Sequence, residues 1–207
     1  NWQYHSHTYP DGHVVELREP QLDLRQLSDG ELHPETLFSL RQAPGMFGMG
    51  LIAAIEQADI DALADPPDSN NDGISGRVNQ VWSVSEQSTV PGRFGWKANR
   101  PDLEITVAAA FADDIGISNP LFPMQPCTDK QPLCQQQPNG NNADGFEIPA
   151  DLLDLVVEFL RHTGAPAARL TEKHSAGQAA FNLAGCQQCH QPSFITSENV
   201  PEAYLAN

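Results

Sequence analysis

The sequence predicts a mainly α-helical fold with long irregular loops and a small β-hairpin at the N-terminus. A turn tripeptide separates two β-prone stretches near the start. Apolar residues recur at three-to-four spacing in later segments, and a stretch rich in Pro, Gln, Asn and Gly interrupts them. Apolar residues form 40% and charged residues 18% of the 207 positions, which is typical of globular chains. We therefore expect a packed core beside the loops.

The predicted hairpin covers residues 1–19. Its two β-prone stretches flank the tripeptide Pro10-Asp11-Gly12, in which the glycine can supply the positive φ of a tight turn. From residue 48 onward the pattern becomes helical. The apolar residues at three-to-four spacing there are Leu51, Ile52, Ile55, Ile60 and Leu63.

Two segments in the middle of the chain differ sharply in character. Residues 101–115 begin with Pro101, carry apolar residues at helical spacing and stop at Gly116, so we expect a helix. Residues 117–150 contain the run QQQPNGNNADG and predict a long surface loop.

Two further helices are expected after this loop. The first ends near Gly164 and carries one apolar stripe, formed by Leu152, Leu155, Val156, Phe159 and Leu160. The second covers about 174–185. We therefore divide the chain into a first region, 1–150, and a second region, 151–207.

Charge and hydropathy restrict the classes of partner. The 11 Lys and Arg residues stand against 27 Asp and Glu residues, and the net charge of −16 disfavours nucleic acid or anionic lipid. The same charge suits a basic protein partner or bound cations. No apolar run approaches the roughly 20 residues of a membrane helix, so we expect no membrane span in this chain.

The strongest motif is Cys186-Gln-Gln-Cys189-His190. Cys-x-x-Cys-His is the attachment signature of a c-type haem, in which two thiols bind the porphyrin vinyl groups and the adjacent imidazole becomes the proximal iron ligand. The motif therefore predicts covalent haem c, with His190 on the iron.

Two alternatives to haem remain open. A thioredoxin-like dithiol would lie between a strand and a helix of a βαβ unit, but the segment before the motif has a helical pattern. A four-cysteine zinc site would have to recruit Cys127 and Cys134, whose spacing exceeds that of usual zinc ligand pairs. We favour haem over both.

The flanks of the motif extend the haem interpretation. Gly177 and Phe181 stand four residues apart on the helix that enters the motif, an arrangement that resembles the first helix of cytochrome c folds. There the small residue permits close helix packing and the aromatic covers the haem edge. Phe181 alone could equally be an ordinary core residue. We expect a cytochrome c-like segment over 151–207.

Four stretches of the chain together resemble a bacterial di-haem oxidoreductase family. Its members are labelled thiol oxidoreductases, and it is related to the di-haem cytochrome c peroxidases. The resemblance runs in the same order over nearly all of residues 10–200. The stretches are APGMFGMGLIAAI, DSNNDGISGRVNQVW, GRFGWKANRPDLEITVAAAFADDIGISNPLFP and GQAAFNLAGCQQCHQPSF.

The resemblance implies two haems and two Cys-x-x-Cys-His motifs, whereas this sequence contains one. We therefore expect the chain to be part of a longer protein. Residues 1–150 would be the middle region of the family's architecture, and 151–207 a truncated haem segment.

The ligand on the iron face opposite His190 would decide between peroxide chemistry and simple electron transfer. The 17 residues after His190 contain neither Met nor His, so this ligand must come from elsewhere. Met46 and Met49 are the first candidates, although core packing is the favoured interpretation for both. His162 and His174 are favoured as helix-end or surface residues.

The stretch GRFGWKANR offers further candidates for the site. Arg93 and Lys97 are possible partners for haem propionates. Trp96, and to a lesser degree Trp82, is our candidate electron relay, because the resemblance implies electron passage between haems through aromatic side chains. A buried tryptophan beside two solvated cations is an equally weighted alternative.

The loop Asp68-Ser-Asn70-Asn-Asp72-Gly73-Ile74 resembles the start of an EF-hand calcium loop. Asp68, Asn70 and Asp72 supply oxygens at positions 1, 3 and 5, Gly73 stands at position 6, and Ile74 offers a backbone carbonyl at position 7. The Glu of position 12 is missing. Related di-haem peroxidases hold calcium between haem domains, so we weigh a calcium site against a metal-free Asx-rich turn.

Cys127 and Cys134 close a short loop and predict a disulfide in an oxidising compartment. Covalent haem attachment in bacteria also takes place outside the cytoplasm. Both features predict a periplasmic, exported protein.

Three functions are compatible with these observations. The first is a c-type haem oxidoreductase fragment that transfers electrons in a di-haem peroxidase-like protein, with an electron-donor or acceptor protein and an oxidant such as peroxide as partners. The second is a non-catalytic mono-haem electron-transfer module. The third is a metal-stabilised binding domain. We favour the first, and catalysis would then belong to the complete protein.

Overall fold

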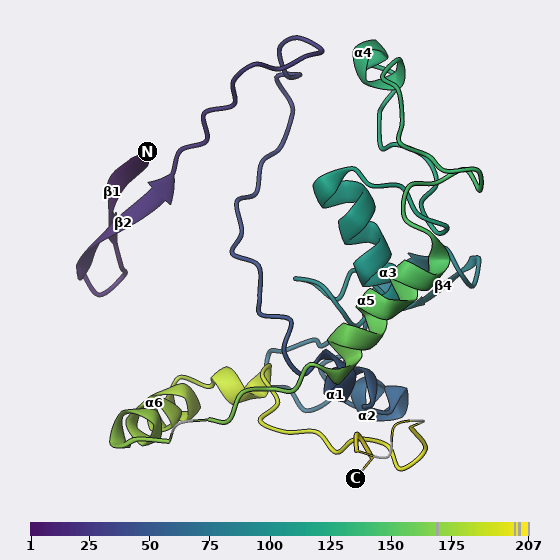
Figure 1. Cartoon of the computed structure of the whole chain (residues 1–207). Coiled ribbons are helices and arrows are strands. Elements are labelled where there is room, and N and C mark those ends of the chain that lie inside the picture. Colours follow the sequence, from purple (N-terminus) through teal and green to yellow (C-terminus); the bar gives the residue numbers. More distant parts are fainter. Residues whose placement is uncertain (169, 201, 203, 207) are drawn as a thin grey trace. The chain divides into compact units, whose positions relative to one another are not determined.

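The computed structural model describes residues 1–168, 170–200, 202 and 204–206. In this part of the chain, six α-helices and two separate antiparallel hairpins are joined by long irregular segments (Figure 1). The N-terminal hairpin is confirmed. The mainly α-helical class is not confirmed, because more of the described residues lie in irregular segments than in helices.

The chain forms two compact units. Unit 1 consists of Asn1–Ala43 and Cys127–Pro138, and unit 2 consists of Pro44–Pro126 and Asn139–Asn207. Each unit is described by itself below.

Unit 1 contains the predicted hairpin. Strands β1 (Trp2–Thr8) and β2 (Val14–Pro20) pair antiparallel, with Trp2 opposite Pro20 and Thr8 opposite Val14. The turn uses Gly12 with a φ of 84°, which an L side chain would adopt only with strain. Both strands have largely exposed side chains.

A short helix, α4 (Pro132–Gln135), completes unit 1. A disulfide between Cys127 and Cys134 anchors this helix, as expected from the sequence. The backbone N–H of Leu133 donates to a carboxylate oxygen of Asp29 at 2.9 Å, which ties the two chain segments of the unit together.

Unit 2 begins with two short helices instead of one continuous helix. Helix α1 (Met49–Ala53) and helix α2 (Gln57–Asp61) are separated because Glu56 is extended, with φ −61° and ψ 138°. A second hairpin follows, formed by β3 (Gln80–Ser83) and β4 (Ser88–Pro91), which the sequence pattern did not predict.

The helix expected over 101–115 is present. Helix α3 (Leu103–Ala109) begins where Asp102 accepts a hydrogen bond from the backbone N–H of Ile105 at 2.7 Å, so the side chain caps a free helix donor. The helix continues as a π-helical turn, Ala110–Asp114, and the chain leaves it through Gly116 with a φ of 70°.

The remaining helices are α5 (Ala150–His162) and α6 (Glu172–Leu183). Helix α5 packs against α1 and α3 and supplies the buried Leu153 and Val157. Helix α6 is followed by a 3₁₀ turn, Cys186–Gln188, and none of its residues is buried. A cytochrome c-like packing of the C-terminal segment is therefore not confirmed.

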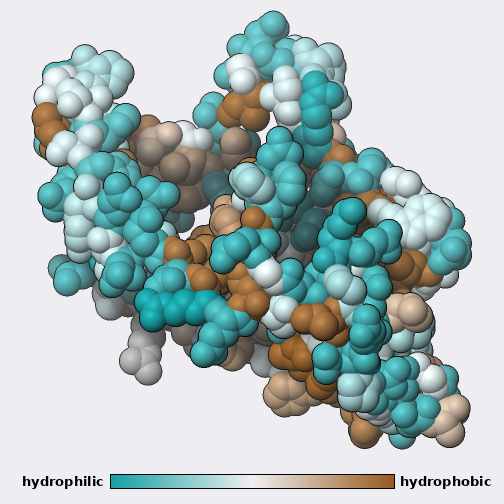
Figure 2. Space-filling view, turned by 90° about the horizontal axis from the view of Figure 1, so that it is seen from above, coloured by the Kyte–Doolittle hydropathy of each residue, from teal (hydrophilic) through white to brown (hydrophobic). Residues whose placement is uncertain are grey.

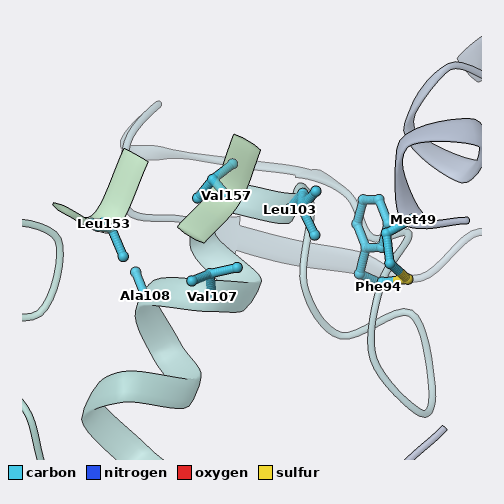
Figure 3. Packing of buried hydrophobic residues seen from close by; sticks show 7 residues of the cluster. All are labelled: Met49, Phe94, Leu103, Val107, Ala108, Leu153 and Val157. Atoms are coloured by element: carbon cyan, nitrogen blue, oxygen red, sulfur yellow. The ribbon is translucent and has the colours of Figure 1, made fainter. Parts of the chain in front are cut away.

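The core of unit 2 lies between α1, α3, α5 and the segment after β4. Figure 3 shows Leu153 near Ala108, Val157 near Val107, and Phe94 beside Met49. The buried cluster consists of Met49, Phe94, Leu103, Val107, Ala108, Leu153 and Val157. Burial of these side chains stabilises the unit by removing apolar surface from water.

The apolar stripe predicted for α5 is only partly correct. Val156 and Leu160 do pack against the core, but Leu152, Leu155 and Phe159 are 49%, 64% and 69% exposed. The side chains that reach the interior are Leu153 and Val157. Other large apolar side chains also reach the surface, where they lie among hydrophilic residues (Figure 2).

Candidate haem-binding site

The Cys-x-x-Cys-His motif folds as a single tight turn directly after α6. Gly185, with a φ of 76°, breaks the helix, and the Cys186–Gln188 3₁₀ turn follows. The carbonyl of Cys186 accepts hydrogen bonds from the backbone N–H groups of Cys189 at 3.2 Å and His190 at 2.9 Å. These two bonds fold residues 186–190 into one turn around the Cys186 carbonyl.

The reactive groups of the motif are accessible. Cys186 is half-buried, Cys189 and His190 are exposed, and both cysteines are free thiols. The ring of Phe181 lies 5.9 Å from the ring of His190, with a tilt of 60° between their planes. Thus an aromatic side chain borders the imidazole on one side, and the thiols remain open to reaction.

These residues fit a c-type haem. The group requires two reduced thiols, an adjacent imidazole and apolar surface, and all three occur within residues 181–190. Leu183, at 91% exposure, adds an uncovered apolar side chain to the same segment. The motif can therefore bind the vinyl carbons through sulfur and the iron through nitrogen.

The structure argues against both alternatives to haem. The strand pairs in the described residues are antiparallel hairpins remote in sequence from the motif, so the βαβ setting of a thioredoxin-like dithiol is not formed there. Cys127 and Cys134 are bonded to each other and cannot complete a four-cysteine zinc site.

Arg93 has a structural role that the sequence did not suggest, because its side chain bonds the chain between α1 and α2. Its guanidinium donates to the backbone carbonyls of Ile52, Ala53 and Ile55 and to the side chain of Gln57, at 2.8–3.1 Å. Burial lowers the pKa of Arg93, and the charges of Glu56 and Asp61 oppose that shift. The guanidinium remains a cation under all ordinary conditions.

The turn after Arg93 presents Trp96 and Lys97 to solvent. Trp96 is 56% exposed, so the interpretation of this residue as a buried tryptophan is wrong. The Asn79 side chain donates to the carbonyls of Lys97 at 3.1 Å and Ala98 at 2.9 Å and fixes the turn. No described hydrogen bond, ion pair or aromatic contact joins Trp96 or Lys97 to the motif, and their roles stay predictions.

Trp82 and the two methionines have clear positions. Trp82 lies in β3 opposite Thr89 and is 58% exposed. Met49 is buried in the core beside Phe94, and Met46 packs against the same cluster. Core packing is therefore confirmed for both methionines.

The two flanking histidines stabilise helix ends. The Nδ1 atom of His162 lies 2.7 Å from the carbonyl oxygen of Glu158, and its ring lies 5.3 Å from the ring of Tyr204. His174 and Thr171 form a capping box at the start of α6. These contacts agree with the helix-end interpretation.

The predicted calcium loop is held by its own side chains. Asp68 accepts from the backbone N–H groups of Asp72 and Gly73, and Asp72 accepts from that of Ile74 at 2.8 Å. Asn70 accepts from the same Asp72 N–H at 3.0 Å. Within the described residues, no group of three or more His, Cys, Asp or Glu side chains is placed to hold a metal ion, and calcium binding here stays a prediction.

A buried polar residue that the sequence pattern did not predict shapes the loop after α3. The Asn119 side chain is fully buried, donates to the carbonyl of Ala108 at 2.8 Å and accepts from the N–H groups of Leu121 and Phe122. An Asn-Pro pair inside a loop is its only sequence signal, and that pair indicates a turn without indicating burial.

Comparison with known proteins agrees with the motif. A family model described as "Di-haem oxidoreductase, putative peroxidase" matches residues 1–203. No curated protein and no solved structure gives a significant match. No helix of the described residues is long and apolar enough to cross a membrane. The family match runs through both compact units and the Cys-x-x-Cys-His turn, and the chain therefore belongs to the di-haem oxidoreductase family of peroxidase-like proteins.

Proposed function

We propose that this chain carries one covalently attached c-type haem and transfers electrons within a di-haem, peroxidase-like oxidoreductase. One observation carries the proposal: two free thiols and an imidazole lie on a single turn, directly after a helix that places Phe181 beside His190. Bound haem supplies one-electron chemistry at its iron.

Each residue of the motif has a defined task in this proposal. Cys186 and Cys189 would hold the haem through thioether bonds, each formed by addition of one S–H group to one vinyl group. His190 would hold the iron through a ring nitrogen. Phe181 would cover the adjoining haem edge.

We propose that Trp96 relays electrons and that Lys97 pairs with a haem propionate. An exposed indole on a turn fixed by Asn79 supports the first role, and an unburied cation next to it supports the second. Arg93 is less suited to a propionate, because its guanidinium already donates to α1 and α2.

We further propose that the protein works in the bacterial periplasm. The Cys127–Cys134 disulfide suits an oxidising compartment, and haem attachment to such motifs takes place there. The partners would be an electron-donor or acceptor protein and an oxidant such as peroxide. The net charge of −16 suits a basic protein partner.

Calcium is proposed as a second ligand, at Asp68, Asn70, Asp72 and the carbonyl of Ile74. The spacing of these oxygen donors and the hydrogen-bonded turn that they form support this proposal. The ion would add fixed positive charge to an acidic loop.

The experiment is a pyridine haemochrome spectrum on protein produced in the periplasm with haem-attachment machinery. Wild type is expected to carry one covalent haem, and a Cys186→Ser, Cys189→Ser double variant none. Peroxide added to the reduced protein should reoxidise it quickly. A wild-type protein without covalent haem would overturn the proposal.

The second candidate is a mono-haem electron-transfer module, favoured by the presence of one motif in 207 residues. It predicts a six-coordinate, low-spin spectrum that peroxide does not change. The same peroxide experiment therefore separates the two functions.

A further inference from the structure

The chain that follows the haem motif is anchored on the break between α1 and α2. We call residues 52–57 the α1–α2 joint. Thr196 forms an antiparallel bridge with Ile55, and the backbone N–H of Ser197 donates to the carbonyl of Ala54 at 2.8 Å. The Ser197 hydroxyl also donates to the carboxylate of Glu56. The joint thus holds the chain only six positions after His190.

Arg93 holds the same joint through different atoms. Its Nη1 donates to the carbonyls of Ile52 at 3.1 Å, Ala53 at 2.9 Å and Ile55 at 2.8 Å, and its Nη2 donates to the Gln57 side chain at 2.9 Å. The last carbonyls of a helix have no partner within the helix, and a cation at that end satisfies them. Arg93 therefore links α1 to α2 across their extended connection.

Arg93 is itself well fixed. Its backbone N–H and that of Phe94 both donate to the carbonyl of Arg100, at 2.8 and 2.9 Å, and the Phe94 side chain is only 3% exposed in the core. The same loop carries Trp96. Hydrogen bonds thus connect the Trp96 loop to Arg93, Arg93 to the α1–α2 joint, and the joint to Thr196 and Ser197.

We propose that Arg93 is a positioning residue that sets the place of the His190 segment through the α1–α2 joint. Arg93 does this without touching the motif: it fixes the carbonyls of Ala53 and Ile55, whose neighbours Ala54 and Glu56 hold Ser197. The haem part of this inference rests on the proposed function. The same hydrogen bonds connect the loop that carries Trp96, the candidate electron relay, to the segment that follows His190, the candidate iron ligand.

The test compares Arg93→Met with Arg100→Met in the 207-residue chain. Arg100 lies at the other end of the same loop and pairs through its side chain with Asp113 at 3.0 Å, so its substitution leaves the joint untouched. Residue-resolved amide hydrogen exchange is measured at Ser197. We expect Arg93→Met to accelerate this exchange by about tenfold, since charge-assisted bonds to the joint are lost. Arg100→Met should leave it unchanged.

A third variant, Arg93→Lys, keeps the charge but loses the planar set of guanidinium N–H donors, and we expect an intermediate rate of exchange at Ser197. Amides of α5 report whether each variant is folded. Unchanged exchange at Ser197 in folded Arg93→Met or Arg93→Lys protein would overturn the proposal without reference to haem.

The haem-loaded protein supplies the second readout. The midpoint potential and the visible spectrum should shift in Arg93→Met and not in Arg100→Met, with partial recovery in Arg93→Lys. Accelerated exchange at Ser197 with an unaltered potential would overturn the positioning of His190. Absence of covalent haem from the wild type would instead overturn the proposed function. Amide exchange at Ser197 does not depend on haem, so the two failures can be told apart.

Discussion

The ring of Phe181 lies 5.9 Å from the imidazole of His190, tilted by 60°, although nine positions separate the two residues. The contact arises because Gly185 ends the helix and the 3₁₀ turn folds back beneath it. An aromatic side chain thereby borders the proposed iron ligand.

Replacing Phe181 by Ala tests this relationship. In the haem-free protein the free energy of unfolding should stay within about 1 kcal/mol of wild type, because the side chain is 39% exposed. In the haem-loaded protein the lost aromatic contact should lower the Tm by about 2–4 °C for each kcal/mol lost. Thermal melts of both forms measure the difference. An equal effect in the two forms would contradict the proposed place of Phe181.

Gly50→Ala should destabilise the core. A Cβ at this position would lie 2.1 Å from the carbonyl oxygen of Arg161, so α1 and α5 must separate to admit it. We expect the free energy of unfolding to fall by about 1–3 kcal/mol in urea titration. A variant as stable as wild type would show that α1 and α5 do not approach so closely.

Gly177→Ala is the matched control, and we expect it to raise the free energy of unfolding where Gly50→Ala lowers it. Apart from its chain neighbours and the nearby backbone of α6, no described atom lies within 4 Å of a Cβ built at Gly177, and alanine favours a helix over glycine by about 0.5–1 kcal/mol. The haem-free protein should therefore gain stability. If haem loading creates a cytochrome c-like packing at this glycine, the same substitution should destabilise the loaded form, and the two signs can be compared directly.

Thiol titration distinguishes the two cysteine pairs. Denatured, unreduced haem-free protein should react with two equivalents of thiol reagent, at Cys186 and Cys189, because Cys127 and Cys134 are bonded. Haem-loaded protein should react with none. Four reactive thiols in the unreduced sample would contradict the disulfide.

Acid should weaken the loop around Glu147. Hydrogen bonds from the backbone N–H groups of Ser118 and Gly140 lower the pKa of Glu147 below its ordinary value of 4.5, while partial burial opposes them. A depressed folded-state pKa adds stability above the unfolded pKa and loses it as pH falls through the folded pKa. Stability should therefore decline below about pH 4.5, and less so in Glu147→Gln. Asp65, whose pKa is lowered by the Ser69 N–H, provides a comparison through Asp65→Asn.

Calcium binding is tested by titration calorimetry on the full chain. Wild type is expected to bind one ion and to melt at a higher temperature in its presence. Asp72→Asn should weaken binding, because it removes a charged ligand. A wild-type protein whose Tm does not respond to calcium would leave the loop as a metal-free turn.

Local signals predicted the elements that are stabilised locally. The N-terminal hairpin follows from Gly12 and the flanking β-prone residues, and the helix over 101–115 follows from its period, its start and Gly116. The haem chemistry proposed for the candidate site depends on the motif alone and stays a prediction, because two thiols and an imidazole at fixed spacing need no distant partner.

The features that the sequence did not reveal depend on distant contacts. Helix α5 is apolar on several sides, and only packing against α3 selects Leu153 and Val157 over Leu155 and Phe159. Arg93 binds carbonyls 38 to 41 positions away, which no local pattern encodes. The β3–β4 hairpin turns through Gln87 at a φ of 51°, without the Asn-Gly or Gly signal of a tight turn.

The exposure of α6 has a consequence for how the protein matures. The helix buries none of its residues, whereas α1, α3 and α5 form the core without it. If haem is attached as proposed, the attaching enzyme would reach this segment while the rest of unit 2 is already folded. Haem attachment and folding of the core would then be separate events, and a chain that failed to receive haem would keep a folded core able to receive it later.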